Sequence, residues 1–150
     1  MVTAEGNILT DFCATLRELI EEKEQTIKSL ATELKVSYII LLRWKNGEKN
    51  LRLNSLIKLA DYFNCSIEYL CGRTKEDIIY TPQECPRFGE WIDTVIKKCG
   101  KTTYQLFKNT TIRSSQYYYW KRGSVPLLTS LDILARFLDT TLDFLVGRER

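Results

Sequence analysis

Two stretches of the chain share one arrangement of apolar and polar positions, and each is closed by Trp-Lys-x-Gly. Ser37 to Gly47 reads Ser-Tyr-Ile-Ile-Leu-Leu-Arg-Trp-Lys-Asn-Gly, and Arg113 to Gly123 reads Arg-Ser-Ser-Gln-Tyr-Tyr-Tyr-Trp-Lys-Arg-Gly. A glycine directly after an apolar-periodic segment is typical of a helix that ends in left-handed backbone. The pattern therefore predicts two short helices.

The repeat extends well beyond these two helices. Residues 12–73 align with residues 88–148, at an offset of 76 before the loop that follows Gly47 and of 75 after it. A unit of roughly 65 residues is long enough to fold alone, whereas the repeats of stacked solenoids are shorter. We therefore expect two tandem domains, residues 1–73 and residues 87–150, joined by a linker at residues 74–86.

Apolar residues at helical spacing predict five helices in each domain, and hence an all-α fold. Polar residues suited to helix capping precede most of these segments. Apolar periodicity also places a fourth helix at residues 53–63 and its counterpart at residues 128–138. The expected caps are Asn7, Thr26, Ser37, Ser66, Thr102 and Thr141. In the second and third predicted helices of the two domains, and in the turn between them, we expect the following residues to contribute core contacts: Val36, Leu41, Trp44, Tyr104, Leu106 and Phe107.

Five short motifs occur in the same order in both copies, although none is diagnostic alone. In the first copy they are Thr26-x-x-x-Leu30-Ala31, Val36-Ser37, Arg43-Trp44-Lys45-Asn46-Gly47, Leu56-x-x-Leu59-Ala60 and Ser66-Ile67-x-x-Leu70-x-Gly72. On these motifs the chain resembles, twice, the lambda-repressor and Cro type of helix-turn-helix domain of phage repressors and xenobiotic-response-element regulators. The resemblance implies two tandem five-helix domains and a sequence-specific, DNA-binding transcriptional regulator.

The same resemblance implies candidate DNA contacts in the second domain, where the third helix reads base edges in the major groove. The family's second helix commonly begins with glutamine, but here Ile27 and Thr103 stand at that position. For any single candidate the alternative is a solvent-facing helix side, with Tyr117 and Trp120 turned to the core. The candidates for base edges are Ser114, Ser115, Tyr118 and Tyr119; those for phosphates are Gln116, Lys121 and Arg122; and Thr102 and Thr103 begin the preceding helix.

The first domain departs from this pattern. Its corresponding candidates for DNA contact are Tyr38, Arg43, Lys45 and Asn46, but Ile39, Ile40 and Leu42 stand among them. If Leu41 and Trp44 lie in the core, these three apolar side chains point partly outward. Burying one such side chain is worth about 1.5–3 kcal/mol, so a helix apolar on all sides is usually covered.

Three coverings of this apolar helix are open. They are thymine methyl groups, another copy of the chain or its own second domain, and a different protein. Apolar contact alone discriminates weakly between bases. We therefore favour a protein interface at Ile39, Ile40 and Leu42, serving a homodimer or a protein partner.

Charge is divided unevenly between the two halves. Residues 1–73 carry ten Lys or Arg and ten Asp or Glu, whereas residues 74–150 carry twelve and nine, so the second half holds the whole net charge of +3. Phosphate neutralisation supplies most non-specific affinity for double-stranded DNA. The second domain is therefore the better candidate for reading DNA.

The sequence lacks several features that are common in enzymes. There is no histidine, no glycine-rich phosphate loop and no G-x-S-x-G motif, and the five cysteines are odd in number and scattered in spacing. We expect no enzymatic activity, no metal or other cofactor, free thiols, and no contact with a membrane. A cytoplasmic location follows from the same pattern.

A protein-interaction adaptor is the alternative function. Such an antitoxin-like or anti-repressor protein would keep the fold without specific DNA binding, because fold alone does not settle function. The linker adds one further expectation: Ile78, Ile79 and Tyr80 make it apolar enough to pack on one of the domains.

Overall fold

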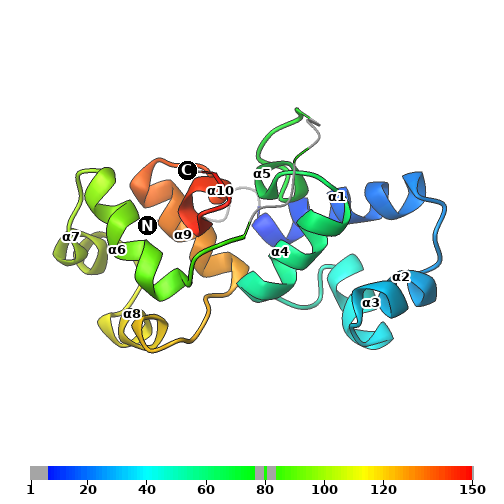
Figure 1. Cartoon of the computed structure of the whole chain (residues 1–150), viewed down its shortest axis with the longest axis horizontal. Helices are drawn as coiled ribbons and strands as arrows, with labels where there is room; N and C mark the ends of the chain where they lie inside the picture. The colour runs from blue at the N-terminus through cyan, green and yellow to red at the C-terminus, as the bar shows by residue number, and fades with distance from the viewer. Residues whose placement is uncertain (1–6, 77–79, 81–83, 150) are drawn as a thin grey trace. The chain divides into compact units, whose positions relative to one another are not determined.

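The computed structural model describes residues 7–76, 80 and 84–149, and in these residues the chain forms ten helices (Figure 1). The all-α prediction is confirmed. The helices fall into two compact units, one with α1 to α5 and one with α6 to α10. These are the first and the second unit.

The first unit follows the predicted helices closely. Side-chain oxygens of Asn7, Thr26 and Ser66 accept hydrogen bonds from the backbone N–H groups that begin their helices, which confirms these three caps. Ser37 stands at the N-cap of its helix, but its hydroxyl accepts no hydrogen bond from the described first turn. The helices are α1 (Ile8–Glu22), α2 (Ile27–Leu34), α3 (Tyr38–Lys45), α4 (Leu53–Tyr62) and α5 (Ile67–Leu70).

The second unit repeats this order. Thr102 accepts a hydrogen bond from the backbone of Gln105, whose side chain in turn accepts one from the N–H of Thr102 at 2.9 Å, so the predicted cap is a complete capping box. Thr141 caps the last helix as predicted. The helices are α6 (Phe88–Lys98), α7 (Thr103–Asn109), α8 (Ser114–Lys121), α9 (Leu128–Leu138) and α10 (Leu142–Val146).

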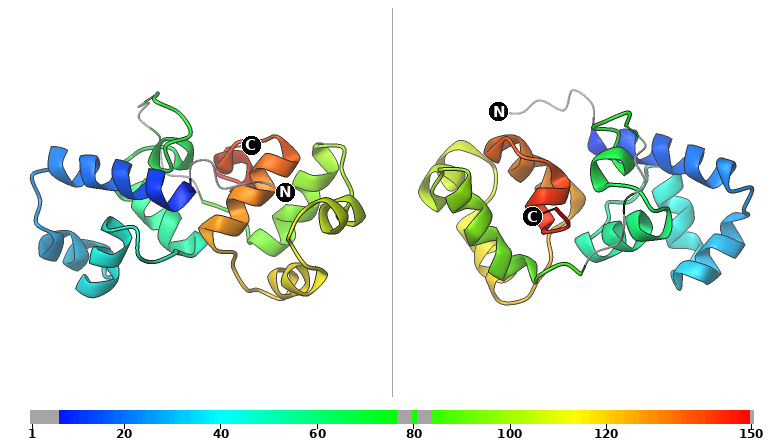
Figure 2. Two further views of the ribbon diagram at one scale, coloured as in Figure 1. Left: turned by 180° about the vertical axis from the view of Figure 1, so that it is seen from behind. Right: turned by 45° about the horizontal axis from the view of Figure 1, so that its top comes forward.

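Each unit buries the apolar faces of its helices in a core of its own. In the first unit α2 packs on α3 and α3 on α1, and in the second α8 packs on α6 (Figure 2). The buried residues lie at the helical spacing that the sequence shows. They include Phe12, Leu16, Leu30, Leu41 and Leu56 in the first unit, and Ile92, Leu106, Trp120, Leu131 and Leu145 in the second.

Three predicted core residues are not fully buried, among them Phe107, which is half-buried against Tyr117. Tyr104 was expected to contribute core contacts, but it is 69% exposed, because Leu106 takes the inward face of α7 and Tyr104, two positions earlier, points away. Val36 is only half-buried because it lies in the turn between α2 and α3. The prediction for Tyr104 is therefore wrong.

The expectation that the linker packs on a unit is met at Tyr80, whose backbone N–H donates to the carbonyl oxygen of Asn64 at 2.9 Å. Ile78 and Ile79 lie outside the described residues. The thiols of Cys65 and Cys71 are free and buried in the first unit.

Candidate functional site

The corresponding helices α3 and α8 end in the same backbone conformation. Gly47 and Gly123 have positive φ angles of 72° and 110°. The next residue donates its N–H back into the helix, from Glu48 to the carbonyl of Arg43 at 2.9 Å and from Ser124 to that of Tyr119 at 3.0 Å. This arrangement turns the chain sharply away from the helix, as the Trp-Lys-x-Gly pattern predicted.

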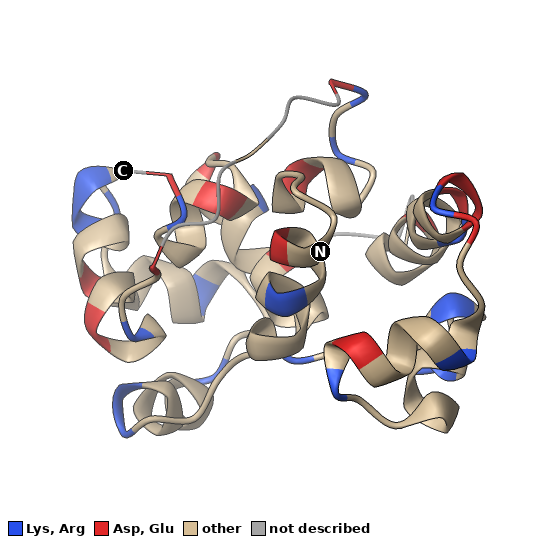
Figure 3. Cartoon of the chain, turned by 45° about the vertical axis from the view of Figure 1, so that its right-hand side comes forward, with Lys and Arg blue, Asp and Glu red and all other residues tan. Residues whose placement is uncertain are grey.

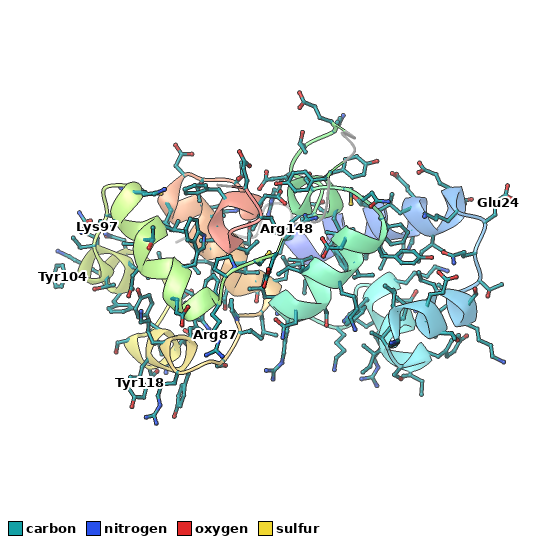
Figure 4. All side chains as sticks on the ribbon, in the orientation of Figure 1. Glu24, Arg87, Lys97, Tyr104, Tyr118 and Arg148 are labelled. Atoms are coloured by element: carbon teal, nitrogen blue, oxygen red, sulfur yellow. The ribbon has the colours of Figure 1, made fainter. Side chains whose placement is uncertain are left out.

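The helix α8 has one buried side and one exposed side. The ring of Trp120 packs edge-on against Phe88, at 5.6 Å between centroids, and that of Tyr117 against Phe107 at 5.7 Å. The opposite side faces solvent, and Figure 4 shows Tyr118 directed away from the unit. The residues on this side, which we call the α8 face, are Ser114, Ser115, Tyr118, Tyr119 and Arg122.

The other predicted phosphate contacts of α8 make hydrogen bonds within the unit. The side-chain oxygen of Gln116 accepts the N–H of Arg113 at 2.9 Å, so Gln116 stabilises the start of the helix. Lys121 pairs with Asp93 on α6, which also accepts the hydroxyl proton of Tyr117. Gln116 is half-buried by this arrangement, whereas Lys121 remains exposed.

The start of α7 is also exposed. Thr103 and Tyr104 face solvent, and the ammonium group of Lys108 lies 5.8 Å from the centre of the Tyr104 ring. The hydroxyl of Thr102 is engaged as a cap, so its main contribution in the unit is structural. Both threonines are exposed, and Thr103 is the one that does not serve as the cap.

The corresponding helix of the first unit, α3, buries Leu41 and Trp44 as predicted. Ile39 is 62% exposed, and Ile40 and Leu42 are half-buried, so the expectation that these three side chains point partly outward is confirmed. We call them the α3 apolar face. Of the DNA candidates of this helix, Tyr38, Arg43 and Asn46 are exposed, and Lys45 is half-buried.

The helix-turn-helix segments α2–α3 (residues 27–45) and α7–α8 (residues 103–121) each carry a net charge of +3, and a difference in charge arises only when their flanking residues are included. Residues 94–131, which contain α7 and α8, include no Asp or Glu and seven basic residues: Lys97, Lys98, Lys101, Lys108, Arg113, Lys121 and Arg122. The aligned residues 18–56 also carry seven basic residues, but with six acidic ones, for a net charge of +1. Figure 3 draws the distribution of charge.

Comparison with known proteins connects the first unit to a family. Residues 15–76 match the model of the Cro/C1-type HTH DNA-binding domain. The match begins within α1 and includes all of α2 to α5. A comparison of the chain with curated proteins and with solved structures finds no significant match.

The Cro/C1-type match agrees with the helix order of the first unit and suggests duplex DNA as a partner. It does not cover the second unit, whose α6 to α10 follow the same order. The second and fifth helices of both units have side-chain caps, whereas α6, unlike α1, has none. No described helix is long and apolar enough to cross a membrane. The described residues also contain no cluster of acidic and cysteine side chains suited to a metal ion.

Proposed function

We propose that this protein is a sequence-specific transcriptional regulator with two tandem helix-turn-helix domains, in which α8 of the second domain reads the major groove. The observation that supports this most directly is the α8 face. It gathers two serines, two tyrosines and an arginine on the solvent side of a helix within an acid-free, basic segment. A positive segment with an exposed helix suits the phosphate-lined major groove.

In this proposal the α8 face divides into base and phosphate contacts. Ser114 and Ser115 at the start of α8, with Tyr118 and Tyr119 one turn later, approach base edges. Arg122 lies at the C-cap, where it approaches a phosphate, and Lys121 joins it if its pair with Asp93 opens. Thr103 at the start of α7 supplies a further phosphate contact.

The first domain has a different role in this proposal. Binding DNA would remove water from its α3 apolar face, and these side chains offer base edges no hydrogen bonds in return. The wider segment of residues 18–56 carries a net charge of only +1. We propose that Ile39, Ile40 and Leu42 contact protein, in a second copy of the chain or in a partner. The DNA candidates of this helix would then lie beside the protein interface and would not contact DNA. They are Tyr38, Arg43, Lys45 and Asn46.

The adaptor function competes with this proposal because of one observation, the 62% exposure of Ile39 on the helix that the family uses for DNA. The two functions differ in their response to salt. Affinity for double-stranded DNA falls with a log-log slope of about 0.9 for each phosphate neutralised, whereas an apolar protein interface responds little.

The test is selection of binding sites from a random duplex pool by the full chain at two salt concentrations. We expect enrichment of a short motif and affinity that falls steeply with salt. Ser115→Ala should relax the preference at one or two positions, whereas Arg43→Ala in α3 should leave the motif unchanged. If the motif is bipartite and both variants alter it, both domains read DNA. If no motif is enriched, the adaptor function replaces the proposal.

A further inference from the structure

The α8 helix carries few groups that are available for hydrogen bonding to a particular base. Discrimination in the major groove normally uses Arg or Lys on guanine, Asn or Gln on adenine, and Asp or Glu on cytosine. On α8 and its two caps the residues of these types are Arg113, Gln116, Lys121 and Arg122. Arg113 is exposed at the N-cap, whereas the other three are bonded within the unit, to the N–H of Arg113, the carboxylate of Asp93 and the hydroxyl of Tyr118 respectively.

Between these engaged residues lie two exposed aromatic rings. Tyr118 is 54% and Tyr119 61% exposed, and their ring centres are 5.9 Å apart in an edge-to-face arrangement. The guanidinium of Arg122 donates to the hydroxyl of Tyr118 and lies 5.3 Å from its ring centre. The Tyr118 ring is therefore held in place at the surface by a cation rather than by burial.

The major groove contains one apolar feature that such rings can recognise, the C5 methyl group of thymine. The serines at the start of α8 donate and accept hydrogen bonds with every base pair, so they discriminate weakly. We infer that α8 adds a preference for thymine, through methyl groups packed against Tyr118 and Tyr119, to the readout by its hydrogen-bonding residues. This inference rests on the proposed function and specifies the chemistry that its binding site would recognise.

A single strand is the other nucleic acid that exposed tyrosines can bind, by stacking with unpaired bases. Duplex DNA is favoured because the rings project from a helix, which fits the major groove, whereas single-strand sites usually track the strand along a groove with several stacking platforms. Single-stranded DNA therefore enters the test as a competitor.

The test uses the full chain and the duplex obtained by selection. Each thymine in the contacted half is replaced in turn by uracil, which pairs identically but lacks the methyl group. Removing a packed methyl group should weaken binding about fourfold, which corresponds to about 0.8 kcal/mol. Uracil in the flanking sequence should have no effect. Replacing a contacted T·A pair by C·G should weaken binding, and 5-methylcytosine in that C·G pair should restore part of the lost affinity, because it returns the methyl group.

Variants locate the contact on α8. Tyr118→Ser and Tyr119→Ser should reduce the difference between thymine and uracil at one position each, whereas Tyr119→Phe, which keeps the ring, should retain it. Equal affinity for thymine and uracil duplexes, with sequence selectivity intact, overturns this inference alone. Preference for a single strand over the duplex also overturns it. Loss of all selective, salt-sensitive duplex binding overturns the proposed function as well.

Discussion

Gly89 on α6 lies directly against the carbonyl group of Trp120 on α8. A Cβ atom on Gly89 would be 2.1 Å from that carbonyl oxygen and 3.0 Å from the Cα of Lys121, so the two helices meet backbone to backbone. At the aligned position the first unit carries Cys13, whose sulfur would lie 3.3 Å from a Cβ atom on Gly47. The position of α8 in its unit is therefore set by the absence of a side chain at residue 89.

Replacing Gly89 tests this contact. We expect Gly89→Ala to lower the free energy of unfolding by about 1–3 kcal/mol or more, because the clash is with backbone atoms that no rotamer change can clear. Urea unfolding measures the loss. Thr94→Ala, at an exposed position on the same helix, is the matched control and should change the stability by less than about 0.5 kcal/mol. If Gly89→Ala and Thr94→Ala are equally stable, the contact between Gly89 and the backbone of Trp120 does not constrain the packing of α6 on α8.

The arginines at aligned positions near the end of each unit should differ in importance. Arg148 is fully buried and its guanidinium donates to the carboxylate of Asp143 at 2.9 Å, whereas Arg73 lies 3.9 Å from Asp11 and both its side chain and its partner's are partly exposed. Removing one partner of a buried pair leaves an uncompensated charge. We expect Arg148→Gln to cost about 3–5 kcal/mol of stability and Arg73→Gln about 1 kcal/mol or less. Chemical unfolding of the two variants compares them, and equal losses would contradict the argument from burial.

The α3 apolar face predicts a change in association. Ile39→Gln with Leu42→Gln should weaken self-association, or binding of a partner, while the helix content stays unchanged, because Ile39 is exposed and Leu42 only half-buried in the unit. Sedimentation velocity measures association, and circular dichroism controls for folding. The matched control is Asn54→Gln at an exposed position on α4. An unchanged sedimentation profile together with lost DNA binding would assign this face to DNA instead.

The carboxylate of Glu33 predicts a pH effect in the first unit. It accepts hydrogen bonds from the hydroxyl of Tyr62 and, at 3.1 Å, from the amide of Gln25, and these bonds lower the pKa of Glu33. A lowered pKa means that the folded state favours the charged form. The resulting stabilisation is present above the ordinary carboxyl pKa and is lost as the pH falls through the lowered value.

Thermal unfolding between about pH 7 and about pH 3 checks this sign. The wild-type chain should be more stable than Glu33→Gln near neutral pH, and the difference should shrink on the acid side. Glu22→Gln, at an exposed position at the end of α1, serves as a control for the loss of a surface charge. A difference between wild type and Glu33→Gln that does not vary with pH would contradict the role of the charged hydrogen bond.

The sequence by itself determined the helices and their order, since these depend on local signals. Apolar spacing, capping oxygens at Asn7, Thr26 and Thr102, and the glycines at 47 and 123 act within a few residues of one another. Each helix predicted in one copy is supported by the helix predicted at the aligned position of the other copy. The inward orientation of Leu41 and Trp44 followed from helical spacing alone.

Tertiary structure decided which polar and aromatic side chains remain available at the candidate site. The pairing of Lys121 with Asp93 joins residues 28 positions apart, and the contact of Gly89 with Trp120 depends on how α6 packs on α8. Tyr104 has the same apolar character as its buried neighbours, but the packing of α7 turns it outward. Local patterns specify a helix and its faces, whereas contacts between helices depend on distances that no single segment contains.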